Sequence, residues 1–159
     1  MTTTATAQLT QVLTFVLAGE EYAVDILRVK EIIEYNTLTR VPGMPASVRG
    51  VINLRGRVVP VIDLAQRFGL PESVITARSS IVMVEIGSTE GDVVIGIITD
   101  SVSEVMDLAA DQIQPPPSFG TAVGAEYLNG MAEKGNHKFV MLLNIDRALG
   151  ADAFVQVNS

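Results

Sequence analysis

Short runs of Val, Ile and Leu, many of them alternating with polar residues, constrain this chain of 159 residues more than any other feature. Turn-forming residues interrupt these runs about every ten residues, a spacing that is typical of β-barrels and β-sandwiches. No strand–helix–strand rhythm appears, so a parallel sheet of the nucleotide-binding kind is not expected. The pattern predicts an all-β fold with about seven to ten short strands.

The expected strands follow the apolar runs. Strands are predicted at 12–17, 22–26, 51–54, 58–64, 81–86, 93–98 and 139–145. Turns are predicted at 19–21 and 55–57, each of which contains a glycine. The segment 27–35 fits either a helix or a strand, and extended structure is favoured. Pro60 lacks a backbone donor, so its strand is expected to lie at a sheet edge or to be bulged.

The remaining segments give weaker signals. Short helical turns are expected within 46–49 and 146–149, the second ended by a glycine. The stretch 111–120 contains three consecutive prolines and is expected to be irregular. The segment 127–131 is left open, and no internal repeat is visible at the level of residue identity.

The residue types that carry most catalytic and metal chemistry are scarce. Cysteine is absent and His137 is the only histidine, which excludes a cysteine nucleophile and a zinc site of the usual kind. Glycine-rich phosphate loops and the serine-elbow motif are also absent. Asp63 follows an apolar strand, where an Asp more often caps a helix or turn than acts as an acid. We therefore expect no enzymatic activity, no cofactor and no metal.

Two other classes of function are open at this point. A small β-barrel hydrolase would need two carboxylates brought together by the fold, which the sequence does not exclude. A small-molecule-binding barrel is disfavoured, because ligand pockets are usually lined with aromatic residues and these make up 5% of the chain.

The charge balance limits the partners. The 18 Asp and Glu against 11 Lys and Arg give a formal charge of −7, which repels phosphate backbones and anionic lipid. The polar start of the chain does not resemble a signal peptide, and no apolar run approaches the roughly 18 residues of a spanning helix. We expect a cytoplasmic protein with no nucleic-acid partner and no direct membrane insertion, in which residues 1–11 form a mobile tail.

The stretch VPGMPASVRGVINLRGRVVPVIDL is unusually dense in Gly, Pro and Arg. Gly50 and Gly56 permit backbone angles closed to other residues, and Asn53 can hydrogen-bond its own turn. Arg55 lies at the turn between two apolar strands, where its guanidinium could hold a carboxylate through two bonds. On the residues alone, a well-formed hairpin with a solvated Arg55 is the simpler interpretation.

NLRGRVVPVIDL resembles the signature of the CheW family, which has the form GVxNLRGxxxPVxDLR. FVLAGEEYAVDILRVKEII is similar to that family's opening, and VIGIITDSVSEVMDLAADQIQPPPSF is similar to its second half. The likeness runs in order from about Phe15 to Leu149, which implies a CheW-like domain at 12–150 and a C-terminal tail at 151–159. One departure is Ser47, at a position where the family often has an aromatic residue.

The resemblance implies both a fold and a function. CheW-like proteins are two SH3-like, five-stranded β-barrels packed over a shared hydrophobic core. They are non-enzymatic adaptors that couple the cytoplasmic tip of a methyl-accepting chemoreceptor to the regulatory domain of the histidine kinase CheA, with further CheW-like copies as additional partners. The chain resembles the free-standing coupler rather than the related module at the end of the kinase.

The resemblance also implies a receptor-facing surface. Its expected members are Val29, Glu31, Gly50, Asn53, Arg55 and Gly56. Glu31 and Arg55 are expected to form an ion pair there, which would hold the turn in one shape for the partner. No residue is assigned to the kinase contact.

Overall fold

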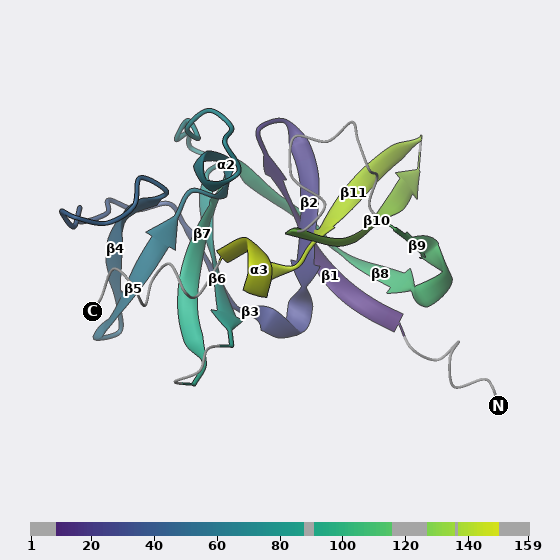
Figure 1. Ribbon diagram of the computed structural model, residues 1–159, viewed down its shortest axis with the longest axis horizontal. Coiled ribbons are helices and arrows are strands. Elements are labelled where there is room, and N and C mark those ends of the chain that lie inside the picture. Colours follow the sequence, from purple (N-terminus) through teal and green to yellow (C-terminus); the bar gives the residue numbers. More distant parts are fainter. Residues whose placement is uncertain (1–8, 88–90, 116–126, 136, 150–159) are drawn as a thin grey trace.

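The computed structural model of the protein describes residues 9–87, 91–115, 127–135 and 137–149. Within them, eleven strands form two sheets that build two adjoining lobes (Figure 1). The terminal lobe holds a six-stranded sheet in the order β8-β1-β2-β11-β10-β9, and the central lobe holds a five-stranded sheet in the order β3-β6-β7-β5-β4. The prediction of an all-β fold with two lobes is confirmed, with one strand more than expected in the terminal lobe.

The elements have the following bounds. The terminal lobe contains β1 (Leu9–Leu17), β2 (Glu20–Asp25), β8 (Ser101–Ala109), β9 (Ile113–Gln114), β10 (Leu128–Gly135) and β11 (Lys138–Leu143). The central lobe contains β3 (Val29–Glu34), β4 (Val48–Leu54), β5 (Arg57–Ile62), β6 (Ser80–Ile86) and β7 (Val93–Thr99). The short helices are η1 (Ile26–Arg28), α2 (Leu64–Arg67), η2 (Ala110–Gln112) and α3 (Ile145–Leu149). No helix among the described residues is long and apolar enough to cross a membrane.

The first hairpin differs from the prediction at both of its ends. The strand expected to start at residue 12 begins at Leu9, because β8 is long enough to pair with it as far as Ala109. The turn expected at 19–21 consists of Ala18 and Gly19, whose φ angles of 52° and 83° suit a two-residue hairpin loop. The next residue, Glu20, already pairs with Leu17.

Most of the other predicted strands are confirmed. The hairpin expected at 81–86 and 93–98 is β6–β7, and the ambiguous segment 27–35 contains the strand β3. The open segment 127–131 is the first part of β10. The strand expected to end at Ile145 ends earlier, because that residue starts α3.

Two predictions of local structure are wrong. The helical turn expected within 46–49 is a single β-turn, closed by a bond from Val48 N to the Pro45 carbonyl at 2.9 Å, after which β4 begins. The stretch expected to be irregular, 111–120, starts with ordered structure, because it holds the end of η2 and all of β9. Its residues 116–120 lie outside the described part of the chain.

Pro60 does not lie at a sheet edge, and the register shift of the β4–β5 pair falls on β4, between Val48 and Gly50, rather than at Pro60 itself. Its strand β5 lies inside the sheet, between β7 and β4. The β4 residue opposite Pro60 is Val51, which exchanges both of its backbone hydrogen bonds with Thr39 at 2.8 and 3.0 Å, away from β5. Pairing of β5 with β7 begins only at Val61, so no ladder bond requires a donor from Pro60.

The two lobes share a structural plan that residue identity conceals. Each has a hairpin, β4–β5 or β10–β11, whose first strand has a register shift just before a glycine, Gly50 or Gly130. The second strand of each hairpin pairs in parallel with another strand of its sheet and then leads into a short helix, α2 or α3. The lobes are therefore two versions of one unit.

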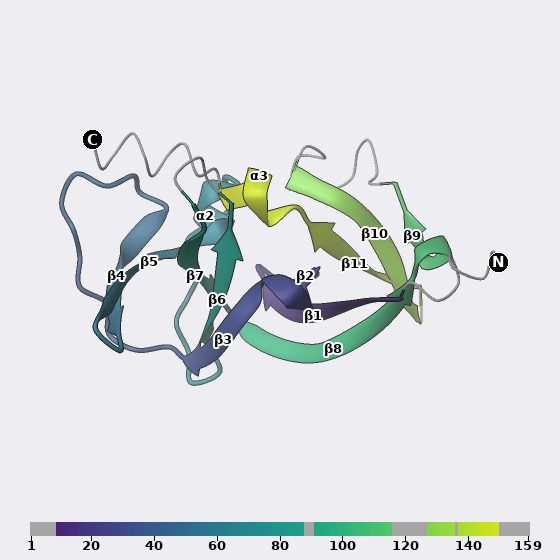
Figure 2. The same ribbon diagram turned by 90° about the horizontal axis from the view of Figure 1, so that it is seen from below.

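A shared apolar core joins the lobes. The largest buried cluster contains side chains of both sheets, among them Phe15, Tyr22 and Val24 of the terminal lobe and Val82, Val84 and Ile95 of the central lobe. Two smaller clusters fill the individual lobes. Strand β2, predicted to be half-buried, is buried on both faces, because its Ala23 belongs to the terminal lobe's own cluster. Figure 2 shows α3 lying at this junction, close to α2.

Gly50 and Gly130 are expected to tolerate no side chain. An added Cβ would lie 2.6 Å from a backbone carbonyl oxygen in both cases, that of Thr39 for Gly50 and that of Gln114 for Gly130. Overpacking of this kind typically costs about 1–3 kcal/mol. We expect Gly50→Ala and Gly130→Ala each to lower the free energy of unfolding by about that amount. Chemical denaturation measures it, with Gly87→Ala as the control because its Cβ would meet nothing within 4 Å. Coincident unfolding curves for Gly50→Ala, Gly130→Ala and Gly87→Ala would contradict the inference that the two glycines have no room for a side chain.

Candidate functional site

Glu31 and Arg55 form an ion pair on the central lobe. Arg55 Nη1 donates to Glu31 Oε1 and Arg55 Nη2 donates to Glu31 Oε2, both at 2.8 Å. Two parallel bonds of this kind require the planar guanidinium, since an ammonium offers no such fork. The ion pair expected from the sequence is therefore present.

The turn that carries Arg55 has an unusual backbone. Arg55 and Gly56 have φ angles of 53° and 84°, the left-handed conformation that both central residues of a type I′ hairpin turn require. Asn53 Oδ1 accepts a bond from the Gly56 amide at 2.9 Å, which closes the turn. Gly56 adopts this conformation without strain, whereas a residue with a Cβ is disfavoured there. The chain thus places a long cationic side chain at a position where Asn or Gly would be less strained.

The ion pair connects the two edges of the central sheet. Glu31 belongs to β3 and Arg55 follows β4, and these strands lie at opposite ends of the strand order. The pair lines a groove of about 320 Å³ whose other walls are the charged side chains of Lys30 and Arg57 and the apolar side chains of Leu54, Val59, Met83 and Val94. The pair therefore links the two edge strands of the central lobe and forms part of the wall of a groove with mixed charged and apolar lining.

The contact stabilises both charged states. Hydrogen bonds from Arg55 lower the pKa of the Glu31 carboxyl, although its partial burial opposes the shift. The same bonds raise the pKa of Arg55. A carboxyl with a lowered pKa contributes its stabilisation above the ordinary carboxyl range and loses it as the pH falls through the folded-state value. The pair is therefore intact at neutral pH.

The structure gathers four of the six predicted site residues and leaves two apart. Glu31, Asn53, Arg55 and Gly56 form the pair and its turn. Val29 belongs to the same strand as Glu31, but its partly buried side chain packs against the shared core. Gly50 is buried against Thr39, and this close packing explains why the position is a glycine without any contact to a partner. The groove walls were not predicted, because their side chains meet only once β3, β4, β6 and β7 are assembled.

A buried ionic network holds the base of the same hairpin. The Asp63 side chain is fully buried and accepts bonds from Arg49 Nη1 at 3.0 Å, from the Ser73 amide and hydroxyl at 2.8 Å each, and from the Ala65 amide at 3.1 Å. The bond to Ala65 caps α2, which confirms the role predicted for Asp63. The guanidinium of Arg49 also lies 3.1 Å from Glu72. Sequence reasoning missed this network, although an Asp among apolar residues signals a buried partner.

Groups suited to catalysis are not assembled in the described part of the chain. It contains no cluster of three or more His, Asp or Glu side chains that could hold a metal ion. The His137 side chain is fully exposed, and its Nδ1 lies 3.9 Å from Glu133 Oε2. Asp63, the buried carboxylate, has its oxygens occupied by structural bonds.

Comparison with known sequences gives a consistent result. A family model described as the CheW-like domain matches residues 11–153. The chemotaxis protein CheW of Klebsiella aerogenes is 35% identical over 147 residues, which is 92% of this chain and 86% of the relative. The chemotaxis protein CheW of Treponema pallidum is 33% identical over 132 residues, which is 83% of this chain and 78% of the relative.

A solved structure resembles the fold as well. The crystal structure of the scaffolding protein TtCheW from Thermoanaerobacter tengcongensis superposes with a TM-score of 0.77 at 32% sequence identity. The superposition covers 89% of this chain and 88% of that one, an extent that takes in strands of both lobes.

Removing the Asp63 charge should destabilise the protein strongly. The variant Asp63→Asn leaves the Arg49 guanidinium, whose side chain is only 15% exposed, without its buried partner. Breaking a buried pair in this way costs about 3–5 kcal/mol. Glu72→Gln is the matched control, because Glu72 touches the same guanidinium from a side chain that is 55% exposed. It should change the free energy of unfolding by less than about 1 kcal/mol. Similar losses in both variants would show that burial does not set the strength of this network.

Proposed function

The chain belongs to the CheW family of chemotaxis scaffold proteins, and on that premise we propose that it couples the cytoplasmic tip of a chemoreceptor to the regulatory domain of the kinase CheA. The family is non-enzymatic, so its members act by holding partners in place. A signal would then pass as a coupling free energy between two contact sites.

The observation that carries the receptor assignment is the exposed Glu31–Arg55 pair. Its Arg55 side chain is 71% exposed although two hydrogen bonds and a turn fix its position. The two-residue turn holds the Arg55 backbone in a left-handed conformation like that of Ala18 in the first hairpin, which places its side chain at the tip of the β4–β5 hairpin. A preorganised guanidinium loses little further freedom on binding, which favours a specific contact. The receptor-facing surface is proposed to centre on this pair and its turn, with Asn53 and Gly56 setting the turn and Val29 supporting β3 from within.

Apolar side chains lie next to the pair along the chain. Leu27 of η1 is 84% exposed, and Ile32 of β3 is 43% exposed. Exposed aliphatic side chains in this part of the chain, together with an oriented Arg, are a composition suited to a protein interface. They support a protein as the partner rather than a small solute.

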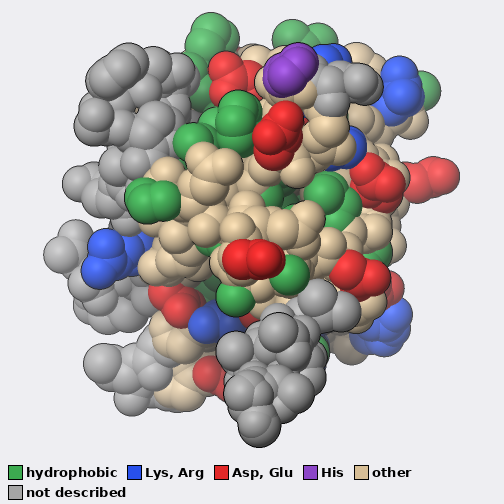
Figure 3. All heavy atoms as spheres, turned by 90° about the vertical axis from the view of Figure 1, so that its right-hand side faces the viewer, with side chains coloured by type: hydrophobic (Ala, Val, Ile, Leu, Met, Phe, Trp, Pro, Cys, Tyr) green, Lys and Arg blue, Asp and Glu red, His purple; other side chains and the backbone are tan. Residues whose placement is uncertain are grey.

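The terminal lobe offers separate surfaces for other partners. Figure 3 shows its outer end, where acidic and hydrophobic side chains are interspersed among the described residues. We propose that the kinase regulatory domain and further CheW-like copies bind away from the Glu31–Arg55 pair, so that one molecule holds several partners at once. The formal charge of −7 and the chemistry of these partners support a cytoplasmic site of action at the receptor array, without nucleic-acid binding.

The adaptor assignment predicts a ternary complex. Receptor signalling fragments and the CheA regulatory domain should co-purify on tagged full-length protein, and each should do so without added nucleotide. The wild-type chain should hold both together, because weak single contacts gain strength when several act at once. Failure of the folded protein to bind either fragment from its own organism would overturn the proposal.

Substitution of Arg55 should weaken receptor binding much more than it affects stability. Arg55→Ala and Glu31→Ala each remove the fixed pair and should reduce receptor affinity about tenfold. Arg55→Lys should restore little of the receptor affinity, since an ammonium lacks the planar fork of the guanidinium. Exposed pairs contribute little to stability, so melting temperatures should change by no more than a few degrees.

Calorimetric titration and thermal melting of the same preparations test this directly. Arg78→Ala is the control, because it removes one exposed positive charge of the central lobe that forms no ion pair within the described part of the chain. Unchanged receptor affinity in all three site variants would remove this surface from the proposal. A large fall in melting temperature for Arg55→Ala would instead give the residue a structural role.

A further inference from the structure

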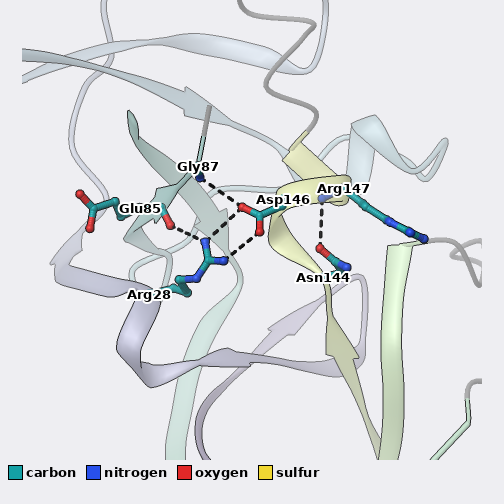
Figure 4. Close-up of polar contacts among 6 residues, drawn as sticks. All are labelled: Arg28, Glu85, Gly87, Asn144, Asp146 and Arg147. Atoms are coloured by element: carbon teal, nitrogen blue, oxygen red, sulfur yellow. Dashed lines mark hydrogen bonds and ion pairs between the residues drawn. The ribbon is translucent and has the colours of Figure 1, made fainter. Parts of the chain in front are cut away.

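A polar cluster joins the two lobes where η1 faces α3 (Figure 4). Arg28 Nη1 donates to Asp146 Oδ1 at 3.1 Å, and Arg28 Nη2 donates to Asp146 Oδ2 at 2.8 Å. Arg28 Nη1 also donates to the backbone carbonyl of Glu85 in β6 at 3.0 Å. The amide of Gly87 donates to Asp146 Oδ1 at 3.3 Å. One guanidinium and one carboxylate thus connect the end of η1, strand β6 and helix α3.

The carboxylate in this cluster is itself held in place by α3. Asn144 starts the helix: its side-chain oxygen accepts from the Arg147 amide at 3.2 Å, and its carbonyl accepts from the Ala148 amide at 2.8 Å. On the other side, Arg67 Nε of α2 donates to the carbonyl of Ala148. The central lobe therefore contacts α3 through Arg28 at one side and through Arg67 at the other.

The energy of the pair is modest but its geometry is restrictive. The bonds from Arg28 lower the pKa of Asp146, with a smaller contribution from the Gly87 amide, so the carboxylate is charged at neutral pH. The two side chains are 38% and 45% exposed, which screens their attraction. Two parallel bonds nevertheless require one orientation of the two planes. The cluster is therefore better suited to fix direction than to add stability.

Arg28 also occupies a particular place in the chain. It is the last residue of η1 and directly precedes β3, the strand that carries Glu31. The start of η1 is fixed as well, since Asp25 Oδ1 accepts from the Leu27 amide at 2.9 Å. The hydrophobic attraction between the lobes is non-directional, although close packing of the shared core limits the range of angles. A bidentate pair across the junction adds a directional contact that narrows this range.

We propose that Arg28 and Asp146 are positioning residues, which set the angle between the lobes and so hold the Glu31–Arg55 surface in a fixed relation to the partner surfaces of the terminal lobe. This inference rests on the proposed function only for its consequence in binding. Its structural part, the angle between the lobes, stands independently.

The experiment measures the distance between the lobes directly. Because the chain has no cysteine, Val58→Cys on the central lobe and Lys138→Cys on the terminal lobe give a single pair of spin labels. We expect pulsed electron paramagnetic resonance to show a broader and shifted distance distribution when Asp146→Asn is added. Asp146→Glu, which keeps the charge, should recover part of the native distribution. Arg28→Lys serves as a second test should Asp146→Asn fail to fold, and it should also broaden the distribution.

The matched control is Glu104→Gln, which removes an equally exposed carboxylate from an ion pair with Lys134 inside the terminal lobe. Its distance distribution should match that of the parent. Titration of the corresponding proteins without the cysteine substitutions, because Val58 pairs with Asn53 of the proposed receptor surface, should show receptor affinity about 2- to 30-fold weaker for Asp146→Asn and unchanged for Glu104→Gln.

The outcomes separate the two proposals. Native distance distributions in both Asp146→Asn and Arg28→Lys would overturn the positioning role, whatever the binding data show. Altered distributions in a protein whose parent binds no receptor would confirm the angle-setting role and reject the receptor assignment. Altered distributions with native affinity would show that the angle does not matter to the receptor and would overturn the stated consequence.

Discussion

The structure depends on one shared apolar core between two β lobes. Strands β2 and β6 have no solvent face in their central parts: Tyr22 and Val24 of β2 and Val82 and Val84 of β6 meet in this core, while the alternate residues fill the separate lobes. Neither lobe could expose that face to water without a large loss of hydrophobic free energy. Each lobe therefore requires the other, and the two form a single folding unit whose remaining surfaces are free for partners.

Because the lobes share a plan, their differences are informative. The hairpins β4–β5 and β10–β11 each carry a basic residue at or near the turn, and each pairs it with an acid on another strand. In the central lobe this is Arg55 with Glu31, and in the terminal lobe Lys134 lies 2.6 Å from Glu21 and 3.1 Å from Glu104. The guanidinium is fixed by a two-residue turn and remains exposed, whereas the ammonium is divided between two carboxylates and is 28% exposed. The common unit thus ends in a rigid, exposed ion pair on one lobe and in a less exposed group of one cation and two carboxylates on the other.

The sequence predicted the strands better than it predicted their assembly. Alternation of Val and Ile located β6 and β7, and Asn53 with Gly56 identified the turn, because these signals are local. Two-sided burial of β2 was missed, since the small Ala23 reads as a solvent-facing position until the second face is known to be covered. Arg28 and Asp146 lie 118 residues apart, and no local pattern connects them. The resemblance to a family led to the Glu31–Arg55 pair, which the residues alone left as one of two interpretations.

Two ion pairs of the central lobe and the one at the junction of the lobes differ in burial, and their physical roles follow from it. Asp63 is fully buried, so its pairing with Arg49 is required wherever the fold forms, and its loss leaves a charge that water cannot reach. Arg28 and Asp146 are about half exposed, where attraction is screened but bond geometry persists, which suits a contact that fixes direction. Arg55 is mostly exposed and contributes least to stability, so its ion pair is better suited to presenting a surface to solvent than to holding the fold together. Along the β4–β5 hairpin, the buried ion pair at the base maintains the fold, and the exposed ion pair at the tip offers a surface to a partner.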